Sequence, residues 1–216
     1  MARLTCLGAV AALVLWLGTS SPALRATSLM PVGFEELVVQ ADFVVRVEIL
    51  EVKSMWQGEG PNRCIVTKVS VLVERSMVGA TPANLTLVFL GGRVGADFLT
   101  VTGQPELKVG DRCILFVEKN GQRVCPLVGF GQGHYRIIKD AGPSGLASVA
   151  RSDGHPLGSL EEISLPLDHR SARSVSVRSS GRGVTVDQFE SAIVELARTR
   201  GRPVGALIAP EGVQLR

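Results

Sequence analysis

Histidine, cysteine and aromatic side chains are scarce in this chain, which has three histidines, four cysteines and one tyrosine among 216 residues. No HExxH pattern occurs, which argues against a zincin-type zinc site. The lack of a CxxC pair argues against thioredoxin-like redox chemistry and a zinc knuckle. No Gly-x-Ser-x-Gly elbow is present either. The sequence therefore assigns no catalytic residue, no metal ligand and no cofactor.

Long apolar runs are confined to the first 26 residues. Arg3 supplies a positive charge, the stretch from Leu7 to Gly18 carries none, and small residues follow up to Ala23. This order is typical of a secretory signal peptide, and an apolar run of about a dozen residues is too short to span a bilayer. We expect a signal peptide over 1–26 and a secreted or periplasmic mature protein without a membrane span.

Excess positive charge is also lacking once this segment is removed. Loss of residues 1–26 takes away Arg3 and Arg25 and no acidic residue, so the formal charge falls from +3 to +1. The one arginine cluster, within 170–182, lies in a Ser-rich stretch typical of a solvated linker. Because nucleic-acid binding needs a clustered basic patch, we expect no nucleic-acid partner.

Three cysteines remain after residue 26, namely Cys64, Cys113 and Cys125. They form either one disulfide and one free thiol, as an exported protein allows, or three buried thiols that pack as small apolar side chains. If a disulfide forms, we expect Cys64 to pair with Cys113 or Cys125, because the expected hairpin register puts the latter two on opposite faces.

Period-two alternation and turn signals dominate residues 42–150. The segment 65–74 alternates with one mainly apolar face, which is typical of a half-buried strand. Before it we expect a short helix over 34–41 and a polar loop over 54–62 that holds Met55 and Trp56. The other expected strands are 43–52, the arms of hairpins within 84–102 and 112–130, 134–139 and 146–150.

The two hairpins are predicted from their turn residues. Gly91-Gly92 would set Phe89 opposite Val94, and Asn120-Gly121 would set Phe116 opposite Cys125. Pro126 conflicts with the second register, since proline cannot donate a ladder hydrogen bond. We expect that ladder to break or bulge there.

Regularly spaced short strands favour a mainly β fold, a closed or partly open antiparallel OB-like barrel with a short N-terminal helix. The barrel domain is expected over 27–150. We expect a polar, disordered linker over 151–183, a helix over 184–201 that begins with a Thr185–Gln188 capping box, and a tail over 202–216. This helix either packs on the barrel or binds a partner.

Two segments are candidate binding sites. Phe130, His134 and Tyr135 flank alternating glycines in 129–135, and they either line a site, with Asp97 or Asp111 nearby, or turn a barrel corner. Trp56 is either an exposed interaction anchor or a plug at one end of the barrel.

Residues 34–53, with Ala41-Asp42-Phe43-Val44-Val45-Arg46-Val47 entering a long strand, resemble the start of netrin-like modules, which include the tissue inhibitors of metalloproteinases. The resemblance implies an OB-like five-stranded barrel. It does not extend to zinc chelation, because those inhibitors use an N-terminal cysteine and neither candidate cleavage site, after Ala23 or Ala26, exposes one. Residues 36–140 also resemble uncharacterised exported bacterial proteins, which imply no activity.

These observations favour an exported, non-catalytic β-barrel that binds a protein partner, such as a secreted peptidase or an envelope protein. Two alternatives stay open. One is a small-ligand or hydrolytic site at Gly129–Tyr135, and the other is a structural envelope component whose C-terminal helix packs on another chain.

Overall fold

The computed structural model describes residues 30–139, 146–167 and 183–208. The signal peptide expected over 1–26 and residues 209–216 of the expected tail lie outside these ranges. The elements in chain order are α2 (Phe34–Gln40), β1 (Phe43–Gln57), η1 (Gly60–Asn62), β2 (Cys64–Val78), β3 (Ala80–Pro82), β4 (Asn84–Leu90), β5 (Gly92–Val94), β6 (Asp97–Leu99), β7 (Arg112–Val117), η2 (Phe130–Gly133), β8 (His134–Lys139), β9 (Ala147–Arg151), η3 (Leu160–Ser164), α3 (Val186–Thr199) and β10 (Ala206–Ile208).

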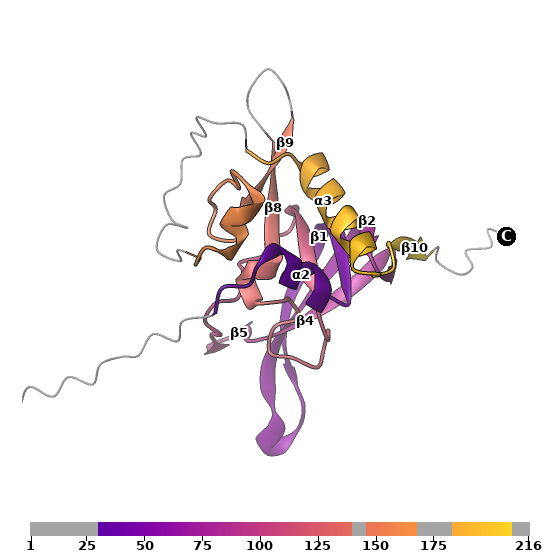
Figure 1. The fold of residues 1–216 in the computed structure, drawn as a ribbon. Coiled ribbons are helices and arrows are strands. Elements are labelled where there is room, and N and C mark those ends of the chain that lie inside the picture. Colours follow the sequence, from indigo (N-terminus) through magenta and orange to yellow (C-terminus); the bar gives the residue numbers. More distant parts are fainter. Residues whose placement is uncertain (1–29, 140–145, 168–182, 209–216) are drawn as a thin grey trace, which may run out of the picture.

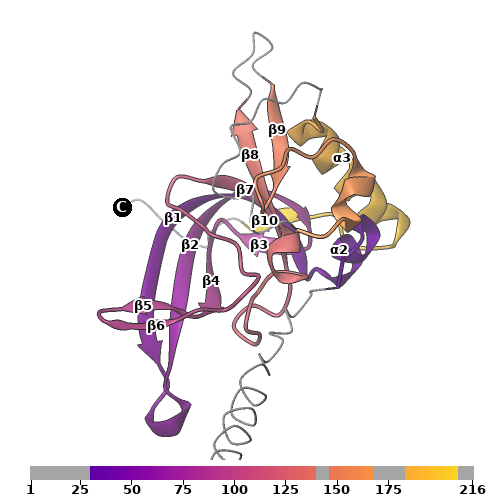
Figure 2. The ribbon, with the colours of Figure 1, turned by 90° about the vertical axis from the view of Figure 1, so that its left-hand side faces the viewer.

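Six strands form one antiparallel sheet in the order β4-β2-β1-β7-β8-β9 (Figures 1 and 2). The expected mainly β class is confirmed, with two helices beside the sheet. Among the described residues β4 does not pair with β9, so the closed form of the expected barrel is not found. The short pairs β3–β10 and β5–β6 complete the strand inventory.

Alternating side chains bury both faces of the sheet, and the helices cover one of them (Figure 2). The core on the helix side contains Leu37, Val44, Met77, Ile114, Phe116, Tyr135, Phe189 and Ile193. The core on the other face contains Val45, Val47, Ile49, Val69, Val71, Leu87, Cys113, Leu115, Cys125 and Leu127. Since neighbouring residues of β1 and β7 enter different cores, a shift of one residue would exchange the two sets.

Helix α3 begins as the sequence predicts. The Thr185 hydroxyl accepts a hydrogen bond from Gln188 N, and the Gln188 side chain accepts one from Thr185 N, which completes the capping box. Phe189 is fully buried against Tyr135, with ring centroids 4.9 Å apart. Of the two alternatives for this helix, the structure therefore has packing on the sheet.

A charged residue lies on the buried face of α3. Glu190 is 1% exposed and accepts hydrogen bonds from Arg46 at 2.8 Å and from Arg75 at 2.6 Å. Glu74 binds Arg112 through both carboxylate oxygens and also pairs with Arg46. Burial raises the pKa of Glu74, but the hydrogen bonds and charges of Arg112 and Arg46 outweigh it and hold the pKa below its usual value. The five side chains fasten α3 to β1, β2 and β7.

The expected hairpin at Gly91-Gly92 is wrong. Strand β4 pairs with β2, so that Leu87 faces Val69, and the tight turn follows Val94, between β5 and β6. Apolar residues that could pair with β4 occur both in β2 and in the segment after Gly92. The structure has the pairing with β2, which is the longer strand. A Cβ on Gly92 would lie 2.3 Å from the hydroxyls of Ser54 and Thr67, so glycine lets β5 cross closely over β1 and β2.

The register expected for the second hairpin is also wrong. Val117 pairs with Leu127, and Glu118 N donates to the carbonyl of Pro126, which removes the need for a proline donor. The Asn120 side chain instead caps the edge of β4, where it accepts from Val88 N and donates to the Thr86 carbonyl. Leu90 N donates to the Val124 carbonyl beside it.

The first half of the expected linker belongs to the folded domain. Leu157 is fully buried, Ile163 is 2% exposed, and both lie in the core under the helices. Val149 of β9 receives a hydrogen bond from Leu157 N and donates one to the Val184 carbonyl, so these segments cover the edge of β9. The domain therefore extends beyond residue 150, while residues 168–182 of the expected linker lie outside the described residues.

We predict that Glu190→Gln destabilises the protein by about 2 kcal/mol, because two arginines lose a buried carboxylate partner while keeping partial contact with solvent. Urea unfolding monitored by circular dichroism would measure the difference. Glu195→Gln on the exposed side of α3 is the matched control and should leave stability within about 0.5 kcal/mol. Equal stability of both variants would contradict the anchoring role of Glu190.

Candidate functional site

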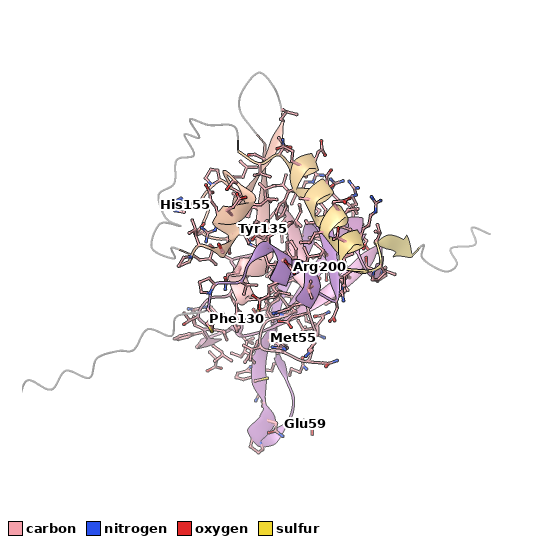
Figure 3. The ribbon with its side chains drawn as sticks, viewed as in Figure 1. Met55, Glu59, Phe130, Tyr135, His155 and Arg200 are labelled. Carbon is pink, nitrogen blue, oxygen red and sulfur yellow. The ribbon has the colours of Figure 1, made fainter. Side chains whose placement is uncertain are left out.

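The four binding residues expected from the sequence do not gather at one place. Trp56 lies in β1, three residues before Glu59, and Figure 3 shows Glu59 at the tip of the β1–β2 hairpin, away from Phe130 and Tyr135. The strand before that tip is longer than expected, because residues 54–57 pair with β2 instead of forming a loop. His134 and Tyr135 are neighbours on β8, so their side chains leave opposite faces of the sheet.

The glycine-rich corner at 129–135 holds the N-terminal segment in place. The Gln132 side chain accepts a hydrogen bond from Val32 N at 2.7 Å and donates to the Met30 carbonyl at 3.0 Å. Gly131 N donates to the Gly103 carbonyl, and Phe130 adopts a positive φ of 60°. The polar groups of this segment thus bind other parts of the chain.

His134 is buried as a neutral ring. Its Nδ1 lies 3.3 Å from the Ser152 hydroxyl, and its Nε2 has no hydrogen-bond partner among the described residues. Burial, with a smaller contribution from Arg136, lowers the pKa of His134 to about 3. Tyr135 packs against the rings of Phe116 and Phe189, and burial there raises the pKa of its hydroxyl. Both side chains are placed in the packed interior of the domain.

The remaining candidates are accounted for within the fold. Cys64, Cys113 and Cys125 are free thiols, so the disulfide considered for Cys64 is not formed. Cys113 and Cys125 enter the same core instead of opposite faces, and burial raises the pKa of Cys125 to about 12. Asp111 accepts hydrogen bonds from Lys108 N and Arg136.

Asp97 begins β6, in the short hairpin that crosses β1 and β2. It therefore belongs to a different part of the molecule from the 129–135 corner, which forms η2 and the start of β8. Asp97 directly precedes Phe98, whose side chain is exposed.

A long hairpin formed by β1 and β2 projects from the rest of the molecule (Figure 2). We call its residues 51–70 the arm. Trp56 pairs across it with Ile65 and is 37% exposed, and the Arg63 guanidinium lies 4.2 Å from the centroid of its ring. That distance is typical of a cation–π contact, which holds the indole in one orientation at the end of the arm.

The β5–β6 hairpin lies across the arm and reaches past β1 (Figure 2). Its Phe98 is 67% exposed, and Arg93 lies 5.4 Å from the centroid of that ring. The arm and this hairpin thus present two large aromatic side chains, each beside an arginine. Phe98 was not a candidate from the sequence because it was expected to lie within the longer hairpin of residues 84–102.

Two lysines lie side by side on the opposite face of the arm. Lys53 of β1 pairs directly with Lys68 of β2, and no described carboxylate forms an ion pair with either of them. Directly opposite like charges disfavour strand pairing. This pair becomes visible only with the register, because the two residues are distant in the sequence.

Within residues 30–139, 146–167 and 183–208, no three His, Cys, Asp or Glu side chains are placed to hold a metal ion, and no helix is both long and apolar enough to cross a membrane. An open, mainly apolar pocket of about 450 Å³ lies between α2, η3 and α3, lined in part by Phe34, Leu160 and Leu196.

Comparisons of the chain with protein-family models, with curated proteins and with solved structures find no match.

We predict that His134 makes the fold sensitive to acid. Its folded pKa of about 3 lies below the unfolded value of 6.5, so its contribution is complete above pH 6.5 and is lost as the pH falls. Between pH 7 and pH 5 the free energy of unfolding should fall by about 2 kcal/mol from this group. Urea unfolding at the two pH values would show this, and His134→Asn should remove most of the fall.

His155→Asn is the matched control, since His155 is only partly buried. It should keep the pH dependence of the original chain. If His134→Asn keeps it as well, His134 is not the group responsible.

Proposed function

We propose that this protein is an exported, non-catalytic β module that binds a protein partner through the arm and the β5–β6 hairpin. The observation that carries the proposal is the exposure of Trp56 and Phe98 on projecting hairpins, each ring oriented by an arginine. Large aromatic side chains and arginine dominate the binding energy of protein interfaces. Holding them before binding lowers the entropy cost of association.

The rigid base of the arm supports this function. Strands β1 and β2 enter both cores of the sheet before they project, and Glu74 and Glu190 tie them to β7 and α3. A narrow projection on such a base is complementary to a concave surface of another protein. The partner is therefore expected to have a cleft, and an exported peptidase is the first class to test.

The finer fold is part of the proposal. We infer a partly open OB-like barrel from β4, β2, β1 and β7, in which the segment after β7 returns to the free edge of β4. The hydrogen bonds that β4 makes with Asn120 and with the Val124 carbonyl support it, as does the buried core on that face. Such a barrel agrees with the netrin-like resemblance of residues 34–53.

Export is proposed from the first 26 residues, whose charge and apolar run are those of a signal peptide. The partner then belongs to the secreted or envelope fraction.

We predict that the chain from residue 27 onward retains one specific protein from that fraction in a pull-down read by mass spectrometry. Trp56→Ala and Phe98→Ala should each weaken retention at least about tenfold, as loss of an aromatic anchor does. Leu165→Ala, another exposed apolar side chain, lies outside the arm and is the control. Retention of nothing, or equal retention by all variants, would contradict the proposed surface.

A further inference from the structure

The outward edge of β1 carries unpaired backbone groups beyond Ile49. On β2, the Ile65 carbonyl and Val73 N bond toward β4 and its flanking residues, so odd-numbered residues of β2 face that side. Even-numbered residues must then face β1, because the N–H and C=O of one residue point to the same side and alternate along a strand. The backbone N–H and C=O groups of Lys68 therefore bond to those of its strand partner, Lys53.

It follows that Val52, Ser54 and Trp56 turn their N–H and C=O groups away from β2. Strand β7 pairs with β1 only over Phe43–Glu48, and its extension ends where Ile49 bonds to Asp111 and Gly110. Among the described residues these six backbone groups have no hydrogen-bond partner. The seven-residue stretch 51–57 is the longest strand segment of the described chain with one open edge.

The two outer edges of the main sheet, in contrast, are covered by other parts of the chain. The β4 edge is bonded to Asn120 and Val124, and the β9 edge to Leu157 and Val184. Proteins normally cover or interrupt strand edges because an open edge is a template for another strand. Covering two edges while leaving 51–57 open in a projecting arm indicates that this edge has a use.

We propose that residues 51–57 of β1 bind an extended segment of the partner protein by β-strand addition. The segment would lie where β7 would continue if the chain did not turn away at Gly110, and we infer the same antiparallel direction. Main-chain hydrogen bonds supply affinity in this mode and alternate side chains supply specificity. This inference rests on the proposed function, since it names how the arm holds its partner.

The side chains beside the open edge of residues 51–57 determine which residues the bound segment should carry. Val52 and Trp56 share a face of β1 with Ser54, which the β5–β6 hairpin crosses at Gly92, so apolar residues of the segment would pack on that face. On the other face the Lys53–Lys68 pair has no described carboxylate partner, so an acidic residue opposite Lys53 is favoured. The expected segment carries apolar residues opposite Val52 and Trp56 and an acidic residue opposite Lys53.

A second copy of the chain fits less well. Antiparallel pairing of two such edges would bring a second Lys53 and a second Lys68 to the same face, where four ammonium groups would meet only the two Glu51 carboxylates. Self-association is therefore an outcome that would overturn the proposal.

The first experiment uses the chain from residue 27 onward and the synthetic peptide Thr-Val-Leu-Thr-Glu-Val-Lys, designed to oppose residues 57 to 51. Amide exchange measured by NMR at about 1 mM peptide should slow about tenfold at Val52, Ser54 and Trp56. The same peptide methylated on the three amides that face β1 keeps every side chain and should give no slowing. Slowing by both peptides, by neither, or at other residues would overturn strand addition.

The second experiment uses the partner retained by the original chain. Ser54→Pro removes an outward N–H and leaves the β2 ladder intact, while Ser54→Ala removes only the hydroxyl bond to Thr67 and is the matched control. We expect about tenfold weaker retention for Ser54→Pro and unchanged retention for Ser54→Ala. Circular dichroism and unfolding curves must match between the two variants, and Val52→Pro replaces Ser54→Pro if they do not.

The two proposals fail in different ways. If Trp56→Ala weakens retention while the proline variant does not, the arm binds its partner without strand addition, and this inference is overturned alone. If no variant changes retention, the proposed surface is wrong. Exchange at Val52, Ser54 and Trp56 that slows with protein concentration alone, together with a dimer in sedimentation, would assign the edge to a second copy.

Discussion

The last hydrogen bonds between β1 and the chain before β7 are made at Ile49, and the shape of the molecule depends on that ending. Ile49 N donates to the Asp111 carbonyl, and Gly110 N donates to the Ile49 carbonyl. Gly110 has a φ of 85°, which lets the chain turn away from the sheet there. Before this point β1 is buried in two cores. After it a register shift between Ile49 and Glu51 leads into an arm with one open edge.

The buried part of the sheet gives the projecting arm a rigid base. Apolar burial on both faces provides most of the stability of such a domain, and the paired arginines and glutamates fix α3 over the helix side. The arm therefore starts from strands that cannot tilt independently of the core. An interaction surface on a rigid base loses less conformational entropy on binding than one on a loose loop.

Local signals were sufficient for the helices and for the existence of most strands. The alternation of residues 65–74 predicted β2, and the capping box at Thr185 predicted the start of α3. The partners of the strands were harder to predict. Leu87 meets an apolar residue in either arrangement, Val69 in the observed pairing with β2 and Ala96 in the hairpin expected at Gly91-Gly92. Such a choice depends on contacts between residues far apart in sequence, which local patterns do not contain.

The candidate surface was only partly predictable for the same reason. Trp56 was a candidate from the sequence, as either an interaction anchor or a plug at one end of the barrel, and the polar residues Ser54 and Gln57 indicated a loop around it. In the structure Ser54 bonds to the Thr67 hydroxyl at 2.9 Å, which satisfies it within a strand. The Lys53–Lys68 pair and the open edge follow from register alone. Glu190 was missed because a charge within an apolar helix face has meaning only with its arginine partners.

The most direct measurement is hydrogen–deuterium exchange of the chain with and without the partner that it retains. We expect new protection at residues 51–57 and on the β5–β6 hairpin, with no change around the pocket between α2, η3 and α3. Protection confined to that pocket, with residues 51–57 exchanging as before, would contradict the assignment of the arm as the binding surface.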